Sequence, residues 1–465
     1  MAIEEDLSQW EIASTWKMVA YGFGYVIINY LLGYGLANLF YFYEVEIGLP
    51  VVYLTLAFII FAIWNMVNDP LLGYLTEKPF KWVKSWGLRA PWVVITSVPI
   101  LIFFYLIWVP PQGWDAFMIF LWFIVITCVF DTFFSIYNDH VYGGYTNQFP
   151  SEYERRRSFA ITTILMFIVI TGMTVVGSLM LQYGNVQSFV NWAIVMVILL
   201  AIFNIILFTG IKESEEMKQM FLTSIEKSEQ KGFFKTVKMA LKTRNFVVSL
   251  AGYTISITAT SLFTASLIYM FKDVYRVPYS YSAIPALAGT FIGICTIPFW
   301  SNYARKHGFK KCYYTAFTIH GLTFLPFLFT WDIWSHTFFF CIYNIFYIGE
   351  VTMLMPVASD TYDEVSSKME KRCDATLVGF RTFFFRIAFL VIAVVIASVH
   401  IITAYNPNPH ALQSTTSQMG VRVHTALIPG IMMIIMGLIF GKFYTLEGAE
   451  KMALVKKLKD LGIYR

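Results

Sequence analysis

The sequence predicts an all-α membrane protein whose twelve transmembrane helices form two six-helix bundles. Three observations support this fold class. Of the 465 residues, 57% are hydrophobic and only 14% are charged, a balance typical of proteins that cross a membrane many times. Apolar runs of about 20 residues recur along the whole chain. The longest polar stretch lies near the middle of the chain and divides those runs into two equal sets.

Each of the twelve apolar runs is long enough to cross a bilayer as a helix. The hydrocarbon core requires about 20 apolar residues, and several runs exceed this length, as tilted helices do. The expected spans are residues 17–43, 51–75, 91–110, 115–145, 157–183, 188–211, 245–272, 281–302, 311–331, 334–361, 375–404 and 421–446.

The basic residues predict the orientation of these spans. Lys and Arg concentrate in every second connection, within residues 78–89, 155–157, 212–244, 305–311 and 368–372. By the positive-inside rule, we expect a multi-pass protein of the inner or plasma membrane of the cell with both termini in the cytoplasm. Lys272 and Arg276 are exceptions to this pattern. Residues 1–16 contain no Lys or Arg, so we expect the first span, rather than a cleaved signal peptide, to direct insertion.

The polar stretches divide the chain into four regions. Residues 1–211 are expected to form an N-terminal six-helix bundle, and residues 244–446 a C-terminal one. Residues 212–243 form a cytoplasmic loop between them. Residues 447–465 form a cytoplasmic amphipathic tail, which either lies on the anionic inner leaflet or remains solvated.

The two halves share a short basic turn that contains glycine and joins the second helix of each half to the third. The first turn contains Gly87 and Arg89, and the second contains Gly308 and Lys310. A parallel repeat of two six-helix bundles is the architecture of the major facilitator superfamily, in which the substrate binds between the halves. The alternative is that any short cytoplasmic loop is basic and contains glycine.

One stretch of the second span carries polar residues inside an otherwise apolar run. Asn65 and Asp69 are four residues apart and share one helix face, and Pro70 weakens the helix at that place. A charged group at the centre of a bilayer costs at least about 2.5–3.5 kcal/mol, so this face is expected to line a wet cavity. The alternative for Asp69 is a carboxylate at a helix end that orders the following loop.

Four further residues are expected at a similar depth. Counting along the spans at about 1.5 Å per residue places Asn29, Asp131, Glu350 and Arg386 in the middle or inner-middle layer with Asp69. Arg386 stays charged and favours a carboxylate nearby, while surplus acids allow protonation to be coupled to substrate. The alternatives are structural pairing of Asp131, a helix-locking Arg386, and pairing of Glu350 with Arg386 or Arg381. Asparagines commonly join helices by hydrogen bonds.

Several stretches resemble the glycoside–pentoside–hexuronide:cation symporters, the family of melibiose permease. Residues 65–92 are similar to that family's second helix and following loop, and residues 150–157 to its loop after span four. Residues 355–374 are similar to its loop after span ten, and residues 21–24 to the opening of its first span. The resemblance touches both halves in chain order.

The resemblance implies roles for individual residues. Asp69 matches a carboxylate of the cation site, and Asp131 matches one that serves both cation and sugar; Asn65 replaces a second cation-site carboxylate. Arg386 stands at the place of a span-eleven lysine, while Asn29 and Thr162 replace a sugar-binding aspartate and arginine. The expected cation site is thus Asp69, Asp131 and Asn65. The expected substrate site is Asn29, Asp131, Thr162, Arg386 and Glu350.

Charged residues near the cytoplasmic ends of the spans suit gates, since ion pairs there can close the inner mouth and break when it opens. The basic residues among them are explained equally well as residues that set the orientation of the spans in the membrane. The expected gating residues are Glu77, Arg89, Arg155, Asp363 and Arg372.

Together these features predict a secondary active transporter that moves a small polar solute, such as a sugar or glycoside, by symport with a proton or Na⁺. The alternative is a lipid or lysolipid translocator of the same fold. We expect no enzyme, because the sequence has no nucleophilic triad, phosphate loop or ATPase motif. Its five scattered cysteines predict no disulfide framework and no metal site. The expected partners are the solute, the coupling cation and the bilayer, without nucleic acid or a resident cofactor, and the expected state is a monomer.

Overall fold

The computed structural model describes residues 13–76, 80, 83–149, 152–215, 218, 233–371 and 373–461. These residues form helices and connections, with no strand among them. The chain divides into two compact units, residues 1–229 and residues 230–465, which we call unit 1 and unit 2.

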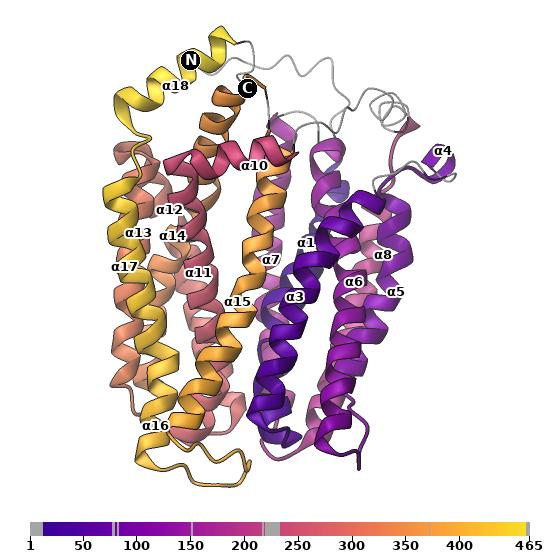
Figure 1. The fold of residues 1–465 in the computed structure, drawn as a ribbon, viewed down its shortest axis with the longest axis vertical. Coiled ribbons are helices and arrows are strands. Elements are labelled where there is room, and N and C mark those ends of the chain that lie inside the picture. The colour runs from indigo at the N-terminus through magenta and orange to yellow at the C-terminus, as the bar shows by residue number, and fades with distance from the viewer. Residues whose placement is uncertain are drawn as a thin grey trace. The chain divides into compact units, whose positions relative to one another are not determined.

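Unit 1 contains six long helical spans (Figure 1). The first span is broken into α1, η2, α2 and η3, and a short helix, α4, precedes the third span. The bounds are α1 Thr15–Asn29, η2 Tyr30–Tyr34, α2 Leu39–Tyr41, η3 Phe42–Glu46, α3 Val51–Thr76, α4 Val83–Trp86, α5 Ala90–Ile107, α6 Ala116–Gln148, α7 Glu152–Met180 and α8 Val186–Gly210.

Unit 2 also contains six spans, together with two helices outside them. The helix α10 crosses the ends of α11 and α15, and α18 follows the last span (Figure 1). The bounds are α10 Phe233–Lys242, α11 Arg244–Tyr269, η4 Met270–Tyr275, η5 Tyr279–Ser282, α12 Ala283–His307, α13 Phe309–Phe324, η6 Leu325–Leu328, α14 Ile333–Met369, α15 Asp374–Ile402, α16 Thr415–Arg422, η7 Val423–Leu427, α17 Ile428–Phe443 and α18 Gly448–Asp460.

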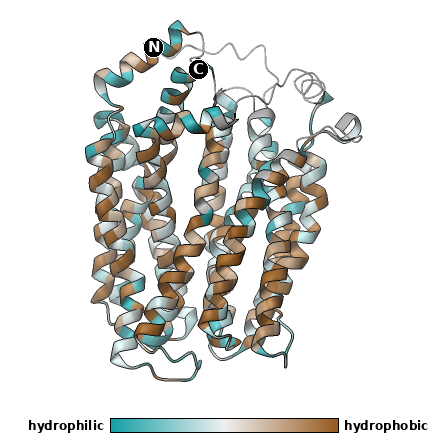
Figure 2. Ribbon diagram, viewed as in Figure 1, coloured by the Kyte–Doolittle hydropathy of each residue, from teal (hydrophilic) through white to brown (hydrophobic). Residues whose placement is uncertain are grey.

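All twelve expected spans correspond to helices. Ten helices of the described residues are long and apolar enough to cross a membrane, and the bent pair Thr15–Tyr34 and Leu39–Glu46 makes an eleventh when counted as one span. The remaining expected span, residues 311–331, is α13 with η6; α13 alone has 16 residues, too few to count by length. The apolar residues that fill the spans are visible in Figure 2. The predicted all-α membrane fold is confirmed.

The two units repeat one pattern of helix packing. In unit 1 the first span, α1, packs on α7 and α8, while α3 packs on α6, and α5 packs on α6 and α8. Unit 2 repeats each pairing with the corresponding span: α11 packs on α15 and α17, α12 on α14, and α13 on α14 and α17. Each unit is therefore a six-helix bundle built on the same plan.

Glycines allow tight turns and close helix contacts in both units. Gly87 and Gly308, just before the third span of each unit, have φ of 99° and 82°, which a residue with a side chain rarely adopts. Gly210 and Gly321 lie where two spans meet closely: a methyl group on Gly210 would lie 3.0 Å from the backbone nitrogen of Tyr21, and one on Gly321 would lie 2.9 Å from that of Ile434.

Two stretches expected to be loops are helical instead. The charged residues after span four begin α7 at Glu152, and those after span ten continue α14 through Pro356 to Met369. These helices extend past their apolar segments, and pairs such as Glu364 and Lys368, four residues apart at 2.8 Å, stabilise the polar turns. Polarity alone therefore made the fifth span begin too late and the tenth span end too early.

Wide π-helical turns interrupt or end several spans. The first span contains η2 and η3, and the first span of unit 2 ends in η4. Each of the terminal turns η3 and η4 contains a buried acid, Glu44 and Asp273 respectively. Such turns frequently occur at functional sites.

Candidate functional site

In unit 1, the polar residues of α3 and α6 meet in one cluster. The hydroxyl of Ser135 donates a hydrogen bond to Asp69 Oδ1 at 2.5 Å, and the amide of Asn68 donates to Asp131 Oδ2 at 3.4 Å. Asp131 and Ser135 are one turn apart on α6, and Asn68 and Asp69 are neighbours on α3, so the two hydrogen bonds join the same short stretches of both helices. The structure thus brings together the two carboxylates expected to bind a cation.

The orientation of α3 explains why this face is polar. Asn65 and Asn68 are buried, whereas Trp64, Val67 and Leu71 are exposed on the outer side of the helix. An amphipathic span with this pattern turns its apolar face to lipid and its polar face inward. The helix continues through Pro70 to Thr76, so the expected weakening there does not end it.

Asn65 supplies an unused oxygen beside the acids. Its side chain is 1% exposed, and its amide nitrogen donates to the backbone oxygen of Phe61 at 2.9 Å. Its Oδ1 is buried and has no hydrogen-bond partner among the described residues. A buried carbonyl oxygen without a donor is costly, and it is a suitable ligand for a hard cation.

Asn29 and Thr162 occupy different surroundings in unit 1. Asn29 ends α1 and donates to the backbone oxygen of Tyr25 at 2.8 Å and to the hydroxyl of Tyr142 at 3.3 Å. Thr162 on α7 is buried against Gly22 of α1, where a methyl group would lie 3.1 Å from its hydroxyl. Asn29 therefore belongs to an aromatic cluster, and Thr162 to a close helix contact.

In unit 2, Glu350 is the centre of a buried trio on three helices. Its Oε1 accepts a hydrogen bond from Ser256 of α11, and its Oε2 lies 2.5 Å from Nδ1 of His320 on α13. The side chains of His320 and Glu350 are 0% and 1% exposed. The sequence suggested an arginine partner for Glu350; its carboxylate contacts this histidine and serine instead.

The two arginines of α15 lie elsewhere in unit 2. Arg381 stacks over the ring of Tyr253 with 4.5 Å to its centroid, and its Nη2 contacts the sulfur of Met355 at 3.3 Å. Arg386 is buried one and a half turns further along the helix. Both arginines are within electrostatic reach of Tyr253.

The expected gating residues are described in part. Arg89 lies against Gly143 and Gly144 of α6. The hydroxyl of Tyr145 donates a hydrogen bond to the backbone oxygen of Arg155 at 2.8 Å. Asp363 is half-buried in α14. Glu77 and Arg372 lie outside the described residues.

A carboxylate that the sequence did not single out organises the same end of unit 1. Glu213, just after α8, accepts hydrogen bonds from the backbone nitrogens of Leu88, Arg89 and Ala90 at 2.8, 2.7 and 3.1 Å. These are the free donors at the start of α5, where a negative charge is stabilised. Unit 2 has a counterpart, because Glu447, just after α17, pairs with Lys310 near the start of α13.

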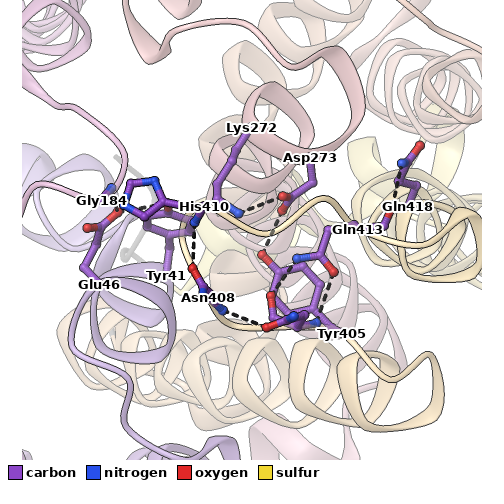
Figure 3. A network of polar contacts seen from close by, with 11 residues as sticks. Tyr41, Glu46, Gly184, Lys272, Asp273, Tyr405, Asn408, His410, Gln413 and Gln418 are labelled. Atoms are coloured by element: carbon purple, nitrogen blue, oxygen red, sulfur yellow. Dashed lines mark hydrogen bonds and ion pairs between the residues drawn. The ribbon is translucent and has the colours of Figure 1, made fainter.

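Lys272, an exception to the charge pattern of the sequence, is buried and neutralised where α11 ends. Its Nζ lies 2.7 Å from Asp273 Oδ1, and the hydroxyl of Tyr405 donates to Asp273 Oδ2 at 2.8 Å (Figure 3). A lysine paired in this way carries no net charge into its connection, which explains why it escapes the positive-inside pattern.

The described residues contain no group of three or more His, Cys, Asp or Glu side chains that could hold a metal ion. The α3–α6 cluster differs from such a centre because its oxygens come from two carboxylates, an amide and a hydroxyl. Oxygens of this kind bind hard cations and not soft transition metals.

Known proteins share both sequence and fold with this chain. Residues 17–448 match the family model described as MFS/sugar transport protein. The sodium-dependent lysophosphatidylcholine symporter 1-A of Danio rerio is 30% identical over 115 residues, which cover 25% of this chain and 20% of that protein. The sodium-dependent lysophosphatidylcholine symporter 1 of Mus musculus is 30% identical over 118 residues, or 25% and 21%. The matches thus span about a fifth of these relatives.

Solved structures extend the likeness to nearly the whole chain. The nucleoside transporter NupG has a TM-score of 0.59 and 12% identity, covering 93% of this chain and 100% of that one. The D-xylose-proton symporter has a TM-score of 0.58 and 10% identity, covering 93% and 96%. At these identities the likeness shows the fold, which is that of major facilitator transporters.

Proposed function

Because this chain belongs to the MFS/sugar transport protein family, we propose that it is a secondary active transporter that couples the movement of a small polar solute to a cation gradient. The solute is a sugar or glycoside, and the cation is Na⁺ or a proton. Transport proceeds by alternating access. The family and fold are those of transporters and not of enzymes.

The α3–α6 cluster is the observation that carries this proposal. Asp69 and Asp131 bring two acids into membrane-spanning helices, where Ser135 donates to the first and Asn68 to the second. Carboxylates inside a membrane are costly and commonly mark ion pathways. We place a cation on Asp69, Asp131 and Asn65 Oδ1, which offer hard oxygen ligands, so its binding can be linked to the conformation of the carrier.

The roles of the other predicted residues follow from this scheme. Asn29, Thr162, Arg386 and Glu350 contact the solute, together with Asp131. Arg89, Arg155 and Asp363 act as gating residues at the cytoplasmic ends of the spans, and Glu77 and Arg372 are assigned the same role. The carrier works as a monomer in the inner or plasma membrane. Both termini lie in the cytoplasm, which is the orientation that the basic connections predict.

Lysolipid transport is the second candidate function. The curated relatives are named as sodium-dependent lysophosphatidylcholine symporters, which favours an amphiphilic solute and Na⁺ as the coupling ion. The same α3–α6 cluster would bind the cation in either case. The two candidates differ only in what occupies the solute site.

Uptake by the purified full-length chain in liposomes tests both candidates. Radiolabelled sugars, glycosides and lysophosphatidylcholine are offered with an imposed Na⁺ gradient, an imposed proton gradient or neither. We expect one solute class to accumulate only with a gradient, and D131N to abolish that accumulation. The matched control D115N changes an exposed carboxylate on the same helix, where Asn also caps the helix start.

Uptake that ignores both gradients in the wild type, or that is unchanged in D131N, contradicts the proposed coupling. Accumulation of lysophosphatidylcholine without any sugar selects the second candidate.

A further inference from the structure

We propose that Ser256, His320 and Glu350 form a proton-binding site within unit 2, separate from the cation site of unit 1, that takes up one proton per chain. Its part in transport rests on the proposed function, whereas proton binding itself does not. Proton binding is a further role for Glu350, in addition to the solute contact proposed above.

The geometry of the trio is that of a shared proton. A single hydrogen bond joins His320 Nδ1 to Glu350 Oε2 at 2.5 Å, and Ser256 holds the other carboxylate oxygen. The three residues come from α13, α14 and α11, so the contact is fixed by helix packing and not by a flexible loop. Both members of the pair are fully buried.

Counting charges shows what the trio can bind. With a neutral imidazole, Nδ1–H donates to Oε2 and the trio has a charge of −1 from the carboxylate. A proton added at the lone pair of Nε2 gives an imidazolium paired with the carboxylate, and the trio becomes neutral. Moving the Nδ1 proton onto Oε2 leaves the charge at zero. The site thus exists in two charge states that differ by one proton.

The Nε2 atom of His320 is the point at which this proton can arrive. It is buried and has no hydrogen-bond partner among the described residues, although the ring is otherwise tightly surrounded. Tyr343 and Tyr347 pack against the ring with centroids 4.6 and 5.5 Å away. An unpartnered ring nitrogen inside a packed site destabilises the fold, so its presence calls for an explanation. Accepting a proton is such an explanation.

A positively charged side chain lies in the same part of unit 2 as the pair. Tyr313 on α13 is within electrostatic reach of both Glu350 and Arg381, so the guanidinium of α15 lies in the same region. Loss of the proton therefore leaves a carboxylate near a cation and not an isolated buried anion. The other groups around the pair are Tyr313, Tyr343, Tyr347 and Arg381, which itself stacks over Tyr253, and the uncharged Trp300 of α12 against Gly349.

Direct proton counting on the purified full-length protein tests the site without any solute. The protein in weakly buffered detergent solution is taken from about pH 9 to about pH 5.5, a range in which exposed carboxylates stay largely ionised. We expect E350Q and H320Q each to take up one proton fewer than the wild type. The double variant should also lose one proton and not two, because the two residues share it.

Two controls calibrate the count. E447Q removes a carboxylate that is 56% exposed and should leave the count unchanged, while H410Q removes an exposed histidine and should lose its own proton. S256A keeps both proton-binding groups. It should retain the full count, because the hydroxyl of Ser256 does not titrate in this range.

A wild-type count in both single variants, or a loss of two protons in the double variant, overturns the proposal. If E350Q does not fold, a wild-type count in H320Q overturns it as well. These results leave gradient-driven uptake and its loss in D131N untouched. Conversely, a protein that fails to transport but loses the shared proton in these variants contradicts only the proposed function.

Discussion

The two units share a plan of helix packing but place different side chains around the acids of their spans. In unit 1 the hydroxyl of Ser135 donates to Asp69 and the amide of Asn68 donates to Asp131. In unit 2 the carboxylate of Glu350 contacts the imidazole of His320, a side chain that can carry a proton. The roles that we propose differ accordingly, with a cation site in unit 1 and a proton site in unit 2.

Removing Glu350 should have the largest effect on stability. E350A leaves His320 and Ser256 buried without their partner and opens a cavity, so we expect a loss of about 3 kcal/mol in the free energy of unfolding. E350Q keeps the volume and should cost about 1 kcal/mol. Chemical unfolding in detergent measures both, and equal losses would show that the carboxylate contacts, and not the packing of the side chain, matter in unit 2.

Sodium should stabilise the protein through unit 1. At a hundredfold excess over its dissociation constant, a bound ion adds about 2.7 kcal/mol to the folded state. We expect NaCl, compared with KCl, to raise the Tm of the wild type and of E350Q, but not that of D131N. If E350Q also loses the rise in Tm caused by NaCl, the assignment of different ions to the two units is contradicted.

The acids that follow the last span of each unit should differ in importance. Glu213 is buried and satisfies three backbone donors, so E213A should cost about 2 kcal/mol. Glu447 is half-exposed in a surface pair with Lys310, so E447A should cost about 0–1 kcal/mol. The comparison is made by unfolding both variants in the same detergent, and a larger cost for E447A would reverse our ranking.

Close helix contacts should be sensitive to added bulk in both units. G210A and G321A introduce a methyl group against a neighbouring backbone and should each cost about 1–2 kcal/mol. The controls G172A and G379A meet no atom within 4 Å and should be neutral or slightly stabilising. Thermal melts in detergent separate the pairs, and a neutral G210A or G321A would show that the helix contact in that unit can widen to admit a methyl group.

The fold was predictable because hydropathy and basic connections act over whole spans. The length of α14 was not, since its last turns are polar yet helical up to Met369. Asp69, Asp131 and Glu350 stand out because charge is rare in apolar runs. Asn68 and Ser135 could have been found, one beside Asp69 and the other a turn from Asp131.

His320 and Ser256 left no comparable signal. Both are uncharged residues at ordinary positions on separate helices, and only the packing of α11, α13 and α14 reveals that they meet Glu350. Glu213 was hidden for a related reason: it lies in a polar stretch, where an acid is unremarkable, and its three donors are backbone groups that no side-chain pattern shows. Partners of this kind become visible only in three dimensions.

The wide turn Tyr30–Tyr34 has a consequence for how the first span tolerates deletions. A π turn holds one residue more than an α turn, so losing a residue there converts it to ordinary helix and leaves the flanking segments in register. The same deletion within α3 would rotate every later side chain by about 100° and carry Asp69 away from Ser135. The first span can therefore lose one residue at this turn, whereas the second span cannot lose one before Asp69 without breaking its contact with Ser135.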